Sequence, residues 1–399
     1  MKILLVNKFL YENGGSETYI FRLGDYFESL GHEVQFFGME DKRNIAGNKW
    51  NILTKNIVFN RVSWGTLLYP FKIIYSLEAR RKIGHIIKLF RPDVVHLNNI
   101  NFQITPSIIY AIRKYRIPII FTAHDYQLIC PNHMLYQPNQ GVLCEECVRS
   151  GFFRCVKNRC IHNSKWRSIL GSLESMLYHG LKTYSQIDKI ICPSEFLEKK
   201  LTGSEVFQGK TIMMHNFIQK TEKSISGKKG DYVLYFGRFT EEKGIRTLIN
   251  VCRRLPEITF LFAGGGPLEN LLVGVHNIKN AGFLRGDELK KTITEALFSV
   301  YPSEWYENCP FSVMESQMYG TPVIGADIGG IPELIKNGET GLLFQAANAD
   351  DLADKISTLW YNRTLLEKMT ENCSAVEFDT PVVYGEKLQN LYKQMTNKE

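Results

Sequence analysis

The stretch YVLYFGRFTEEKG, residues 232–244, decides the fold class of this 399-residue chain. Its first residues, Tyr232 to Phe236, are apolar and mostly aromatic, a pattern typical of a short buried strand. Gly237 ends the strand, and a helical pattern follows Gly244. A strand, a glycine turn and a helix form the repeating unit of a parallel α/β sheet, in which ligands bind at the carboxyl ends of the strands.

The same alternation runs through both halves of the chain. An apolar fraction of 44% with 22% charged residues is enough for two ordinary hydrophobic cores. We therefore predict two Rossmann-like α/β domains. The expected strands are Ile3–Val6, Val34–Phe37, Val94–Leu97, Ile117–Thr122 and Lys189–Cys192 in the first half, and Tyr232–Phe236, Thr259–Ala263, Val275–Lys279, Phe298–Tyr301, Pro322–Ile324 and Leu342–Phe344 in the second.

A polar, lysine-rich stretch after Asn216 marks the boundary between the halves. We predict an N-terminal domain over 1–218 with a cysteine-rich insertion at 130–160, a linker over 219–230, and a C-terminal domain over 231–375. The tail, 376–399, carries Tyr384, Leu388, Leu391 and Tyr392 at helical spacing, so we expect a helix that packs back toward the N-terminal domain.

The N-terminal stretch and the overall composition indicate the compartment and the charge of the protein. Met1 to Asn7 is apolar but short and is followed by Lys8, unlike a signal peptide, and no run of about eighteen apolar residues occurs. The sequence therefore predicts a cytoplasmic protein, with any membrane contact peripheral, at the inner face. The net charge of +7 suits phosphate-bearing substrates or an anionic lipid surface, but it is also common among ordinary enzymes.

Two cations follow the first strand of the second half. Arg238 and Lys243 lie in one strand–loop–helix unit and can converge on phosphate oxygens. The alternative is a solvated helix start. Because cations at a helix N-terminus oppose the helix dipole, an anionic ligand explains them better.

Two carboxylates frame a predicted helix start further along the chain. Glu307 precedes Pro310, which can open a helix that carries Glu315 about one turn inside it. Carboxylates accept hydrogen bonds from vicinal hydroxyls, so the pair could hold a sugar ring and a ribose. Two solvated acids are the alternative.

The first half offers a glycine pair and a histidine. Gly14 and Gly15 join the first strand to its helix and permit a tight turn with N–H groups facing a diphosphate, although an ordinary turn would look the same. His124 follows the strand Ile117–Thr122 and should emerge at the ligand-binding edge, unless it is a structural histidine.

These motifs together resemble the family-four retaining glycosyltransferases. The resemblance rests on the E-x7-E segment from Glu307 to Glu315, on Gly-Arg-Phe and Lys-Gly before it, and on Gly14-Gly15 and His124-Asp125. Further matches are Ala263-Gly264-Gly265-Gly266-Pro267, Gly282-Phe283-Leu284, and the run from Gly320-Thr321-Pro322 through Gly329-Gly330 to Gly341-Leu342-Leu343.

The resemblance implies a GT-B fold, two Rossmann-like domains facing each other across a central cleft. Arg238 and Lys243 would bind the donor diphosphate, Glu315 the ribose, Glu307 the transferred sugar, and Gly15 the phosphates, with His124 beside the sugar. Catalysis would involve His124, Arg238, Lys243 and Glu307. The remaining donor-binding positions implied are Gly14, Gly264, Gly266, Phe283, Leu284, Pro310, Phe311 and Ser312.

The implied reaction is retaining hexosyl transfer from a nucleotide-diphosphate sugar, with UDP favoured and GDP the other option, to a glycan or lipid-linked acceptor. Cell-surface polysaccharide or lipopolysaccharide synthesis is the expected setting. The sequence has no D-x-D motif, so catalysis needs no metal cofactor. An epimerase or a phosphorylase on the same architecture stays open, as does a nucleotide-binding module without activity. An oxidoreductase is disfavoured because G-x-G-x-x-G is missing, and no nucleic-acid partner is expected.

Five of the nine cysteines fall within the insertion, and four of them form the predicted site. Without a secretion signal, Cys144, Cys147, Cys155 and Cys160 suggest a structural zinc site rather than disulfides. Reduced or redox-active thiols are the alternative, and His133 or His162 could replace a ligand.

A basic and aromatic stretch lies between Val58 and Phe90. An amphipathic surface helix here could dock on anionic lipid. Equally, the apolar residues could complete the first core while the cations face water. The residues concerned are Trp64, Leu67, Leu68, Tyr69, Phe71, Ile73, Ile74 and Tyr75 with Arg61, Lys72, Arg80, Arg81, Lys82 and Lys88.

Overall fold

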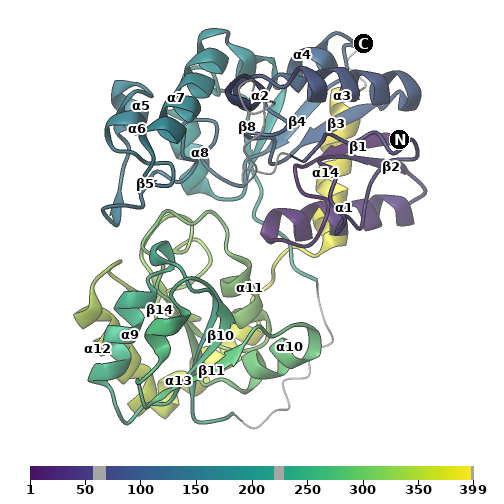
Figure 1. The fold of residues 1–399 in the computed structure, drawn as a ribbon. Coiled ribbons are helices and arrows are strands. Elements are labelled where there is room, and N and C mark those ends of the chain that lie inside the picture. The colour runs from purple at the N-terminus through teal and green to yellow at the C-terminus, as the bar shows by residue number, and fades with distance from the viewer. Residues whose placement is uncertain (57–68, 220–228, 397–399) are drawn as a thin grey trace. The chain divides into compact units, whose positions relative to one another are not determined.

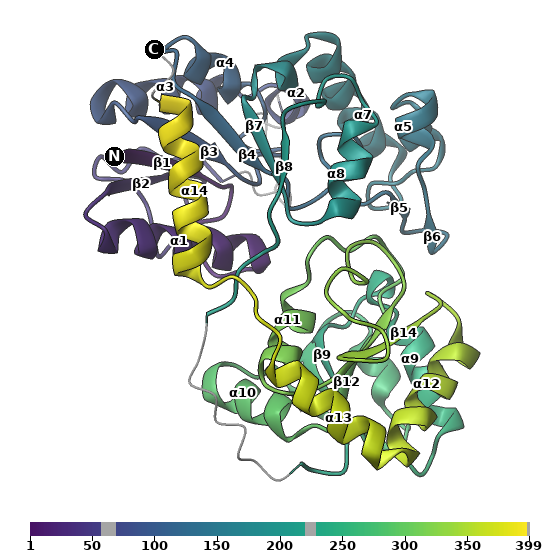
Figure 2. The ribbon, with the colours of Figure 1, turned by 180° about the vertical axis from the view of Figure 1, so that it is seen from behind.

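The computed structural model describes residues 1–56, 69–219 and 229–396 and divides into two compact units. Unit 1 comprises Met1–Leu135, Cys144–Phe217 and the chain from Asp379 onward, and unit 2 comprises Tyr136–Leu143 and Ile218–Phe378. Each unit contains its own parallel sheet (Figures 1 and 2). Part of the expected linker, 220–228, and part of the basic and aromatic stretch, 57–68, lie outside the described residues.

Unit 1 is built on a six-stranded parallel sheet in the order β2-β1-β3-β4-β7-β8. Its central strands are nearly all buried and apolar, as parallel strands covered on both faces must be. Ile3 of β1 pairs with Val34 on one side and Val94 on the other. The strands are β1 (Lys2–Val6), β2 (Glu33–Phe37), β3 (Val94–Leu97), β4 (Ile119–Thr122), β7 (Lys189–Cys192) and β8 (Thr211–Met213).

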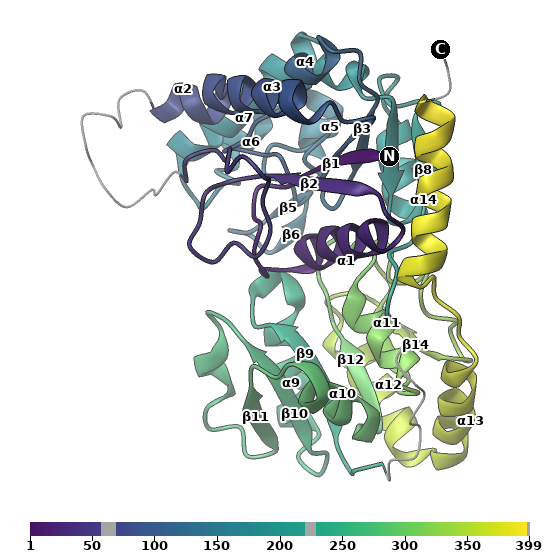
Figure 3. The same ribbon diagram turned by 90° about the vertical axis from the view of Figure 1, so that its right-hand side faces the viewer.

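Helices cover both faces of this sheet. α1 (Gly15–Ser29) and α14 (Pro381–Thr396) pack together on one face, and α3 (Leu77–Phe90) and α4 (Ile108–Arg113) lie on the other (Figure 3). Serine caps begin several of them; Ser76 Oγ, for example, accepts a hydrogen bond from Ala79 N. The other helices are α2 (Tyr69–Ile74), α5 (Glu146–Ser150), α6 (Arg154–Lys157), α7 (Lys165–Gly180), η2 (Thr183–Gln186) and α8 (Glu195–Thr202).

The last helix, α14, completes the core of unit 1. Its buried residues Tyr384, Leu388 and Tyr392 join a cluster that includes Tyr19 and Phe27 of α1. Polar atoms are satisfied within this core, since the Tyr19 hydroxyl lies 2.9 Å from that of Tyr384. A segment at the far end of the sequence is therefore an integral layer of the first unit.

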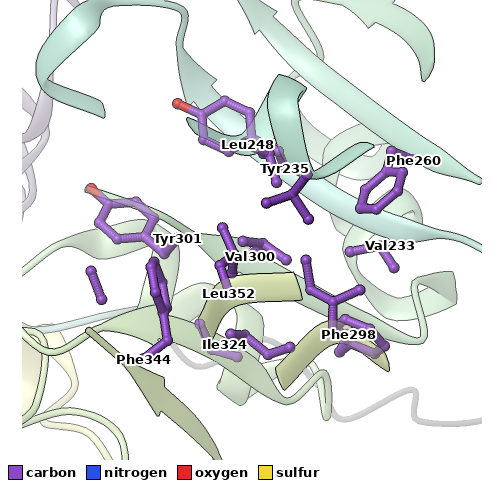
Figure 4. Packing of buried hydrophobic residues seen from close by; sticks show 14 of the residues in the cluster. Val233, Tyr235, Leu248, Phe260, Phe298, Val300, Tyr301, Ile324, Phe344 and Leu352 are labelled. Carbon is purple, nitrogen blue, oxygen red and sulfur yellow. The ribbon is translucent and has the colours of Figure 1, made fainter. Parts of the chain in front are cut away.

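Unit 2 repeats the architecture with the strand order β11-β10-β9-β12-β13-β14. Aromatic and branched side chains of its strands pack against α9 and α12 to form the core, as Figure 4 shows. The strands are β9 (Val233–Arg238), β10 (Phe260–Gly265), β11 (Ile278–Gly282), β12 (Phe298–Tyr301), β13 (Val323–Ala326) and β14 (Gly341–Phe344). The helices are η3 (Glu241–Lys243), α9 (Ile245–Arg254), η4 (Glu269–Leu272), α10 (Gly286–Glu295), α11 (Phe311–Met318), α12 (Ala349–Tyr361) and α13 (Arg363–Ser374).

The predicted fold class is confirmed, with some boundaries displaced. The strand expected at Val275–Lys279 begins at Ile278, because Val275 belongs to a turn in which its carbonyl accepts from Ile278 N. Strand β8 was not predicted, since its three residues are only half-buried at the sheet edge. The antiparallel hairpin of β5 (Tyr136–Gln137) and β6 (Val142–Leu143), within the insertion, was also not predicted.

Candidate functional site

Both sheets have a topological switch point, the kind of place at which open parallel α/β sheets generally bind ligands. In unit 2, β10 lies on one side of β9 and β12 on the other, so the direction of the strand order reverses between β9 and β12. In unit 1 the corresponding place lies between β1 and β3. The motif residues singled out in the sequence follow these strands.

Glycines occur at the carboxyl edge of the unit 2 sheet because other backbone segments pass close to them. Gly264 has φ of +147°, and a Cβ there would lie 1.9 Å from the carbonyl oxygen of Gly237. A Cβ on Gly244, where φ is +70°, would lie 1.8 Å from the carbonyl oxygen of Pro302. Only glycine fits such positions, so the loops after β9, β10 and β12 can pack closely together.

Lys243 and Glu307 form the centre of the unit 2 site. The Lys243 ammonium forms an ion pair and a very short hydrogen bond with Glu307 Oε1, and both side chains are largely buried. It also bonds the Tyr301 hydroxyl at 3.1 Å. The ammonium lies 5.4 Å from the ring centroid of Tyr301 and 5.5 Å from that of Trp305, within cation–π range.

One oxygen of Glu307 accepts all of the hydrogen bonds. Besides Lys243, Oε1 accepts from Trp305 Nε1 at 2.6 Å, Ser303 Oγ at 2.9 Å and Tyr301 OH at 3.2 Å. No described residue donates to Oε2. The carboxylate is therefore held in one orientation, with an oxygen left to accept from a ligand.

The protonation state of Glu307 follows from these contacts. Burial by itself would raise its pKa, but attraction to Lys243 and hydrogen bonds from Lys243, Trp305 and Ser303 hold the pKa below its usual value. Glu307 is thus an anion at neutral pH, paired with a cation.

Arg238 is a more open cation at the same edge. It ends β9, its side chain is 68% exposed, and its guanidinium lies 3.7 Å from Glu242. The η3 turn that carries Glu242 and Lys243 is joined to the loop after β12, because the Glu242 carbonyl accepts from Glu304 N at 2.9 Å and from Ser303 Oγ at 3.2 Å. Arg238 is therefore positioned for an anion that approaches from solvent.

The start of α11 and the end of β11 complete the edge. α11 begins at Phe311 after Pro310, with Ser312 in its first turn and a half-buried Glu315 in the second. The N–H groups at a helix N-terminus are suited to binding an anion. Phe283 follows β11 directly and is 70% exposed, with Leu284 half-buried beside it. An exposed ring at this edge is suited to stacking on a flat base.

In unit 1, the glycine pair stands at the start of α1. Gly14 is extended and Gly15 opens the helix, both exposed at the carboxyl end of β1. Behind them, Glu17 is buried and accepts from Asn7 Nδ2 at 2.9 Å and Ser16 Oγ at 3.0 Å. These bonds fix the turn while its backbone faces solvent.

His124 emerges after β4, half-buried. Its Nε2 lies 2.9 Å from Asn98 Oδ1, and its ring meets that of Tyr19 edge-on at 5.0 Å. Burial lowers the pKa of His124 to about 3, so the imidazole is neutral at pH 7. A neutral ring can contact a sugar without repelling a positively charged reacting carbon.

Sequence reasoning missed a polar cluster beside His124. Lys8 Nζ donates to Asn101 Oδ1 at 2.8 Å, and Asn101 Nδ2 in turn lies 2.8 Å from His133 Nδ1. Burial lowers the pKa of Lys8, and burial raises that of nearby Asp125 to about 6. Lys8 and Asn101 follow β1 and β3, so their place shortly after two predicted strands was the available signal.

Family comparisons match both halves of the chain. The model described as "Glycosyltransferase Family 4" matches residues 13–221, and that described as "Glycosyl transferases group 1" matches residues 217–375. The chain belongs to glycosyltransferase family 4.

One curated relative and two solved structures extend this family-four assignment. The chain is 36% identical over 317 residues to the sulfoquinovosyl transferase of Arabidopsis thaliana, which covers 75% of this chain and 56% of that protein, so it spans little more than half of that relative. The sucrose-phosphate synthase of Thermosynechococcus elongatus superposes with a TM-score of 0.71 at 17% identity, covering all of both chains. Anabaena HepE in complex with UDP superposes with a TM-score of 0.67 at 16% identity, covering 99% of this chain and 100% of that chain. These likenesses confirm the predicted GT-B fold.

The cysteines of the family-four chain's insertion pack differently from the predicted set. Cys147, Cys155 and Cys160 are buried in one cluster with Phe152 and Ile161, whereas Cys144 is only half-buried and outside it. His133 bonds Asn101, as described above, and His162 is exposed. Within the described parts of the chain, no three histidine, cysteine or acidic side chains are arranged to hold a metal ion. Zinc therefore stays a prediction.

Proposed function

We propose that this chain is a retaining glycosyltransferase that uses a nucleotide-diphosphate sugar as donor. The proposal rests mainly on the buried Lys243–Glu307 pair at the unit 2 switch point, in which Glu307 is held through Oε1 alone. The Lys243 ammonium can bind an anionic diphosphate. The Glu307 carboxylate still has an oxygen that can accept hydrogen bonds from the hydroxyls of a sugar.

The residues of unit 2 take distinct parts in this proposal. Lys243 and Arg238 bind the diphosphate and stabilise the charge that builds on it as the bond to the sugar breaks. Glu307 accepts hydrogen bonds from sugar hydroxyls, Glu315 from the ribose, and Phe283 stacks on the base. Gly264, Gly266, Leu284, Phe311 and Ser312 present backbone N–H groups. Pro310 has no N–H and shapes the pocket by opening α11.

The unit 1 residues serve the acceptor and the transferred sugar. His124 lies beside the sugar, and Gly14 and Gly15 address the phosphates. The acceptor hydroxyl attacks the anomeric carbon from the face the nucleotide leaves. The carbon–oxygen bond to the diphosphate breaks, a new glycosidic bond forms, and the acceptor's proton passes to the departing phosphate oxygen. Because attack and departure occur on the same face, the anomeric configuration is preserved.

The donor nucleotide is proposed to be UDP, with GDP the second choice. The fold likeness to HepE, solved with UDP, supports this order. The acceptor is proposed to be a glycan or lipid-linked intermediate of a cell-surface polysaccharide, handled on the cytoplasmic side. Positive side chains take the place of a catalytic metal, so no metal cofactor is invoked.

The test is a donor screen that reads nucleotide release. UDP-, GDP- and ADP-sugars are incubated with candidate glycan and lipid-linked acceptors, and the product's anomeric configuration is determined by NMR. Acceptor-dependent release with retained configuration is expected. Epimerised donor, phosphorolysis of a glycan, or nucleotide binding without turnover would each replace the proposal with the corresponding alternative.

A further inference from the structure

Unit 1 has an open groove on the sheet face opposite α1 and α14. It has a volume of about 1180 Å³ and lies between α3, the end of α4 and the loop at 51–53. None of the residues assigned above to donor or acceptor lines it.

The groove is lined by cations and by no described carboxylate. Arg80, Arg81, His85 and Lys88 come from α3, and Lys114 follows α4. Within the described residues, no acid forms an ion pair with Arg80, Arg81, Lys88 or Lys114. The remaining lining cation, Lys82, is neutralised by Glu78 at 2.7 Å. The groove therefore has a strong, uncompensated positive charge.

The helix α3 keeps its apolar side inside unit 1. The apolar residues of α3, including Ile83, Ile86 and Phe90, are buried in unit 1. What remains outside is the basic face, with Leu77 70% exposed on the rim. Tyr110 and Tyr115 line the groove's other side, and tyrosines suit the boundary between headgroups and water.

The spread of the cations indicates a surface rather than a single anion. Arg81 and Lys88 stand about 10 Å apart along the helix, at about 1.5 Å per residue, and Arg80 is partly engaged by Tyr75 and Tyr110. Separated, half-solvated cations attract many headgroups at once, whereas one phosphate would need donors that converge.

We propose that this groove of unit 1 docks on the surface of an anionic phospholipid bilayer. The contact is electrostatic and shallow, in keeping with the burial of the helix's apolar face. It does not depend on the proposed transferase activity.

Vesicle sedimentation tests the proposal with the full chain. The wild-type protein should bind vesicles of phosphatidylglycerol mixed with phosphatidylcholine and dissociate from them in high salt. It should not bind vesicles of pure phosphatidylcholine. Arg81→Glu, Lys88→Glu and Lys114→Glu together should weaken binding at least ten-fold. The matched control, Arg253→Glu, Lys336→Glu and Lys368→Glu, makes the same change in net charge at exposed sites of unit 2 and should bind like wild type.

Four results would overturn the bilayer proposal. The groove variant could bind as wild type does while keeping its thermal unfolding midpoint, or binding could be indifferent to lipid charge. Saturable one-to-one binding of inorganic phosphate or glycerol phosphate that displaces the vesicles would reassign the groove to a soluble anion. A control variant that loses binding equally would show a general charge effect.

Discussion

The contacts of Glu307 show how a single carboxylate can be both anchored and available. Four donors gather on Oε1. An ion pair this buried would be expensive alone, because burial disfavours both charges. Here the hydrogen bonds from Ser303 and Trp305 offset that cost on the carboxylate side.

Arg238 and Lys243 should differ when each is replaced by alanine. Arg238→Ala should lower kcat by about 100-fold or more, the range for removing one charge-stabilising group, with an unchanged unfolding midpoint, since Arg238 is 68% exposed. Lys243→Ala should lower kcat similarly and also destabilise the protein by about 3 kcal/mol, because Glu307 loses its buried partner. Steady-state kinetics and urea unfolding of both variants measure this. Near-normal turnover in both would reject their assigned role.

Trp305→Phe tests whether the indole N–H tunes Glu307. That hydrogen bond lowers the pKa of Glu307, so removing it should raise the pKa. The carboxylate would then protonate at a higher pH as solutions are acidified, and the acidic limb of the kcat/KM profile should move upward in pH. Trp166→Phe, at an exposed tryptophan, is the matched control. A general loss of activity with an unmoved acidic limb would indicate that Trp305 only fills space.

The sequence motifs predicted Lys243 and Glu307 but not the groups around them. Lys243 was recognisable because it follows a predicted strand, and Glu307 because it precedes a predicted helix start. Tyr301, Ser303 and Trp305 could not be assigned, because they bracket an irregular loop in which spacing does not determine where side chains point. Lys8 and Asn101 were missed for a related reason, since a strand's end indicates an edge but not the hydrogen bonds formed there.

At the scale of elements, a buried histidine ties α14 to the sheet. His96 of β3 bonds Tyr392 OH at 2.6 Å through Nδ1 and Thr122 Oγ1 at 2.7 Å through Nε2. Burial, with a smaller contribution from His124, lowers its pKa to about 3. The folded state therefore keeps His96 neutral where an unfolded chain would protonate it.

This difference predicts acid sensitivity in unit 1. Because the folded pKa lies below the unfolded value, stability is full above about pH 6.5 and falls as pH drops toward 3, by up to about 1.4 kcal/mol per pH unit. Urea unfolding between pH 7 and 5 measures the slope. His96→Gln should reduce the slope by one histidine's share, because His124, whose pKa burial also lowers to about 3, keeps its own share. His85→Gln, at an exposed position, is the matched control. An equal slope in wild type and His96→Gln would disprove the assignment.

The cysteine-rich insertion makes a prediction about thiol access. Of its five cysteines only Cys144 is more than marginally exposed. Iodoacetamide applied to the native, reduced protein should modify Cys144 first, and peptide mass spectrometry identifies the site. Metal analysis of the same sample decides whether zinc is bound. Rapid modification of Cys155 or Cys160 would show that the buried cluster opens.

At the scale of the whole molecule, alternation of strands and helices was enough to predict two parallel sheets. The order of strands within each sheet was not predicted, because it depends on which side of the first strand the chain crosses to. The switch points, and with them the site, follow from that order. Short edge elements such as β8 carry too few buried residues to leave a pattern.

Metal dependence is a property of the whole reaction. If Arg238 and Lys243 carry the charge of the leaving diphosphate, transferase activity should be unchanged by EDTA and not increased by added magnesium or manganese. Initial rates with and without chelator measure this. A rate that falls with EDTA and returns with one of these ions would require a metal in place of the proposed cations.

The position of α14 has a consequence for biosynthesis. Tyr19 and Phe27 emerge from the ribosome early, yet the helix that covers them is translated only after all of unit 2. Throughout elongation the nascent first unit must expose an apolar surface in the crowded cell, where chaperones or premature association compete for it. Final closure of that unit therefore awaits the synthesis of α14, whatever the rate at which its sheet assembles.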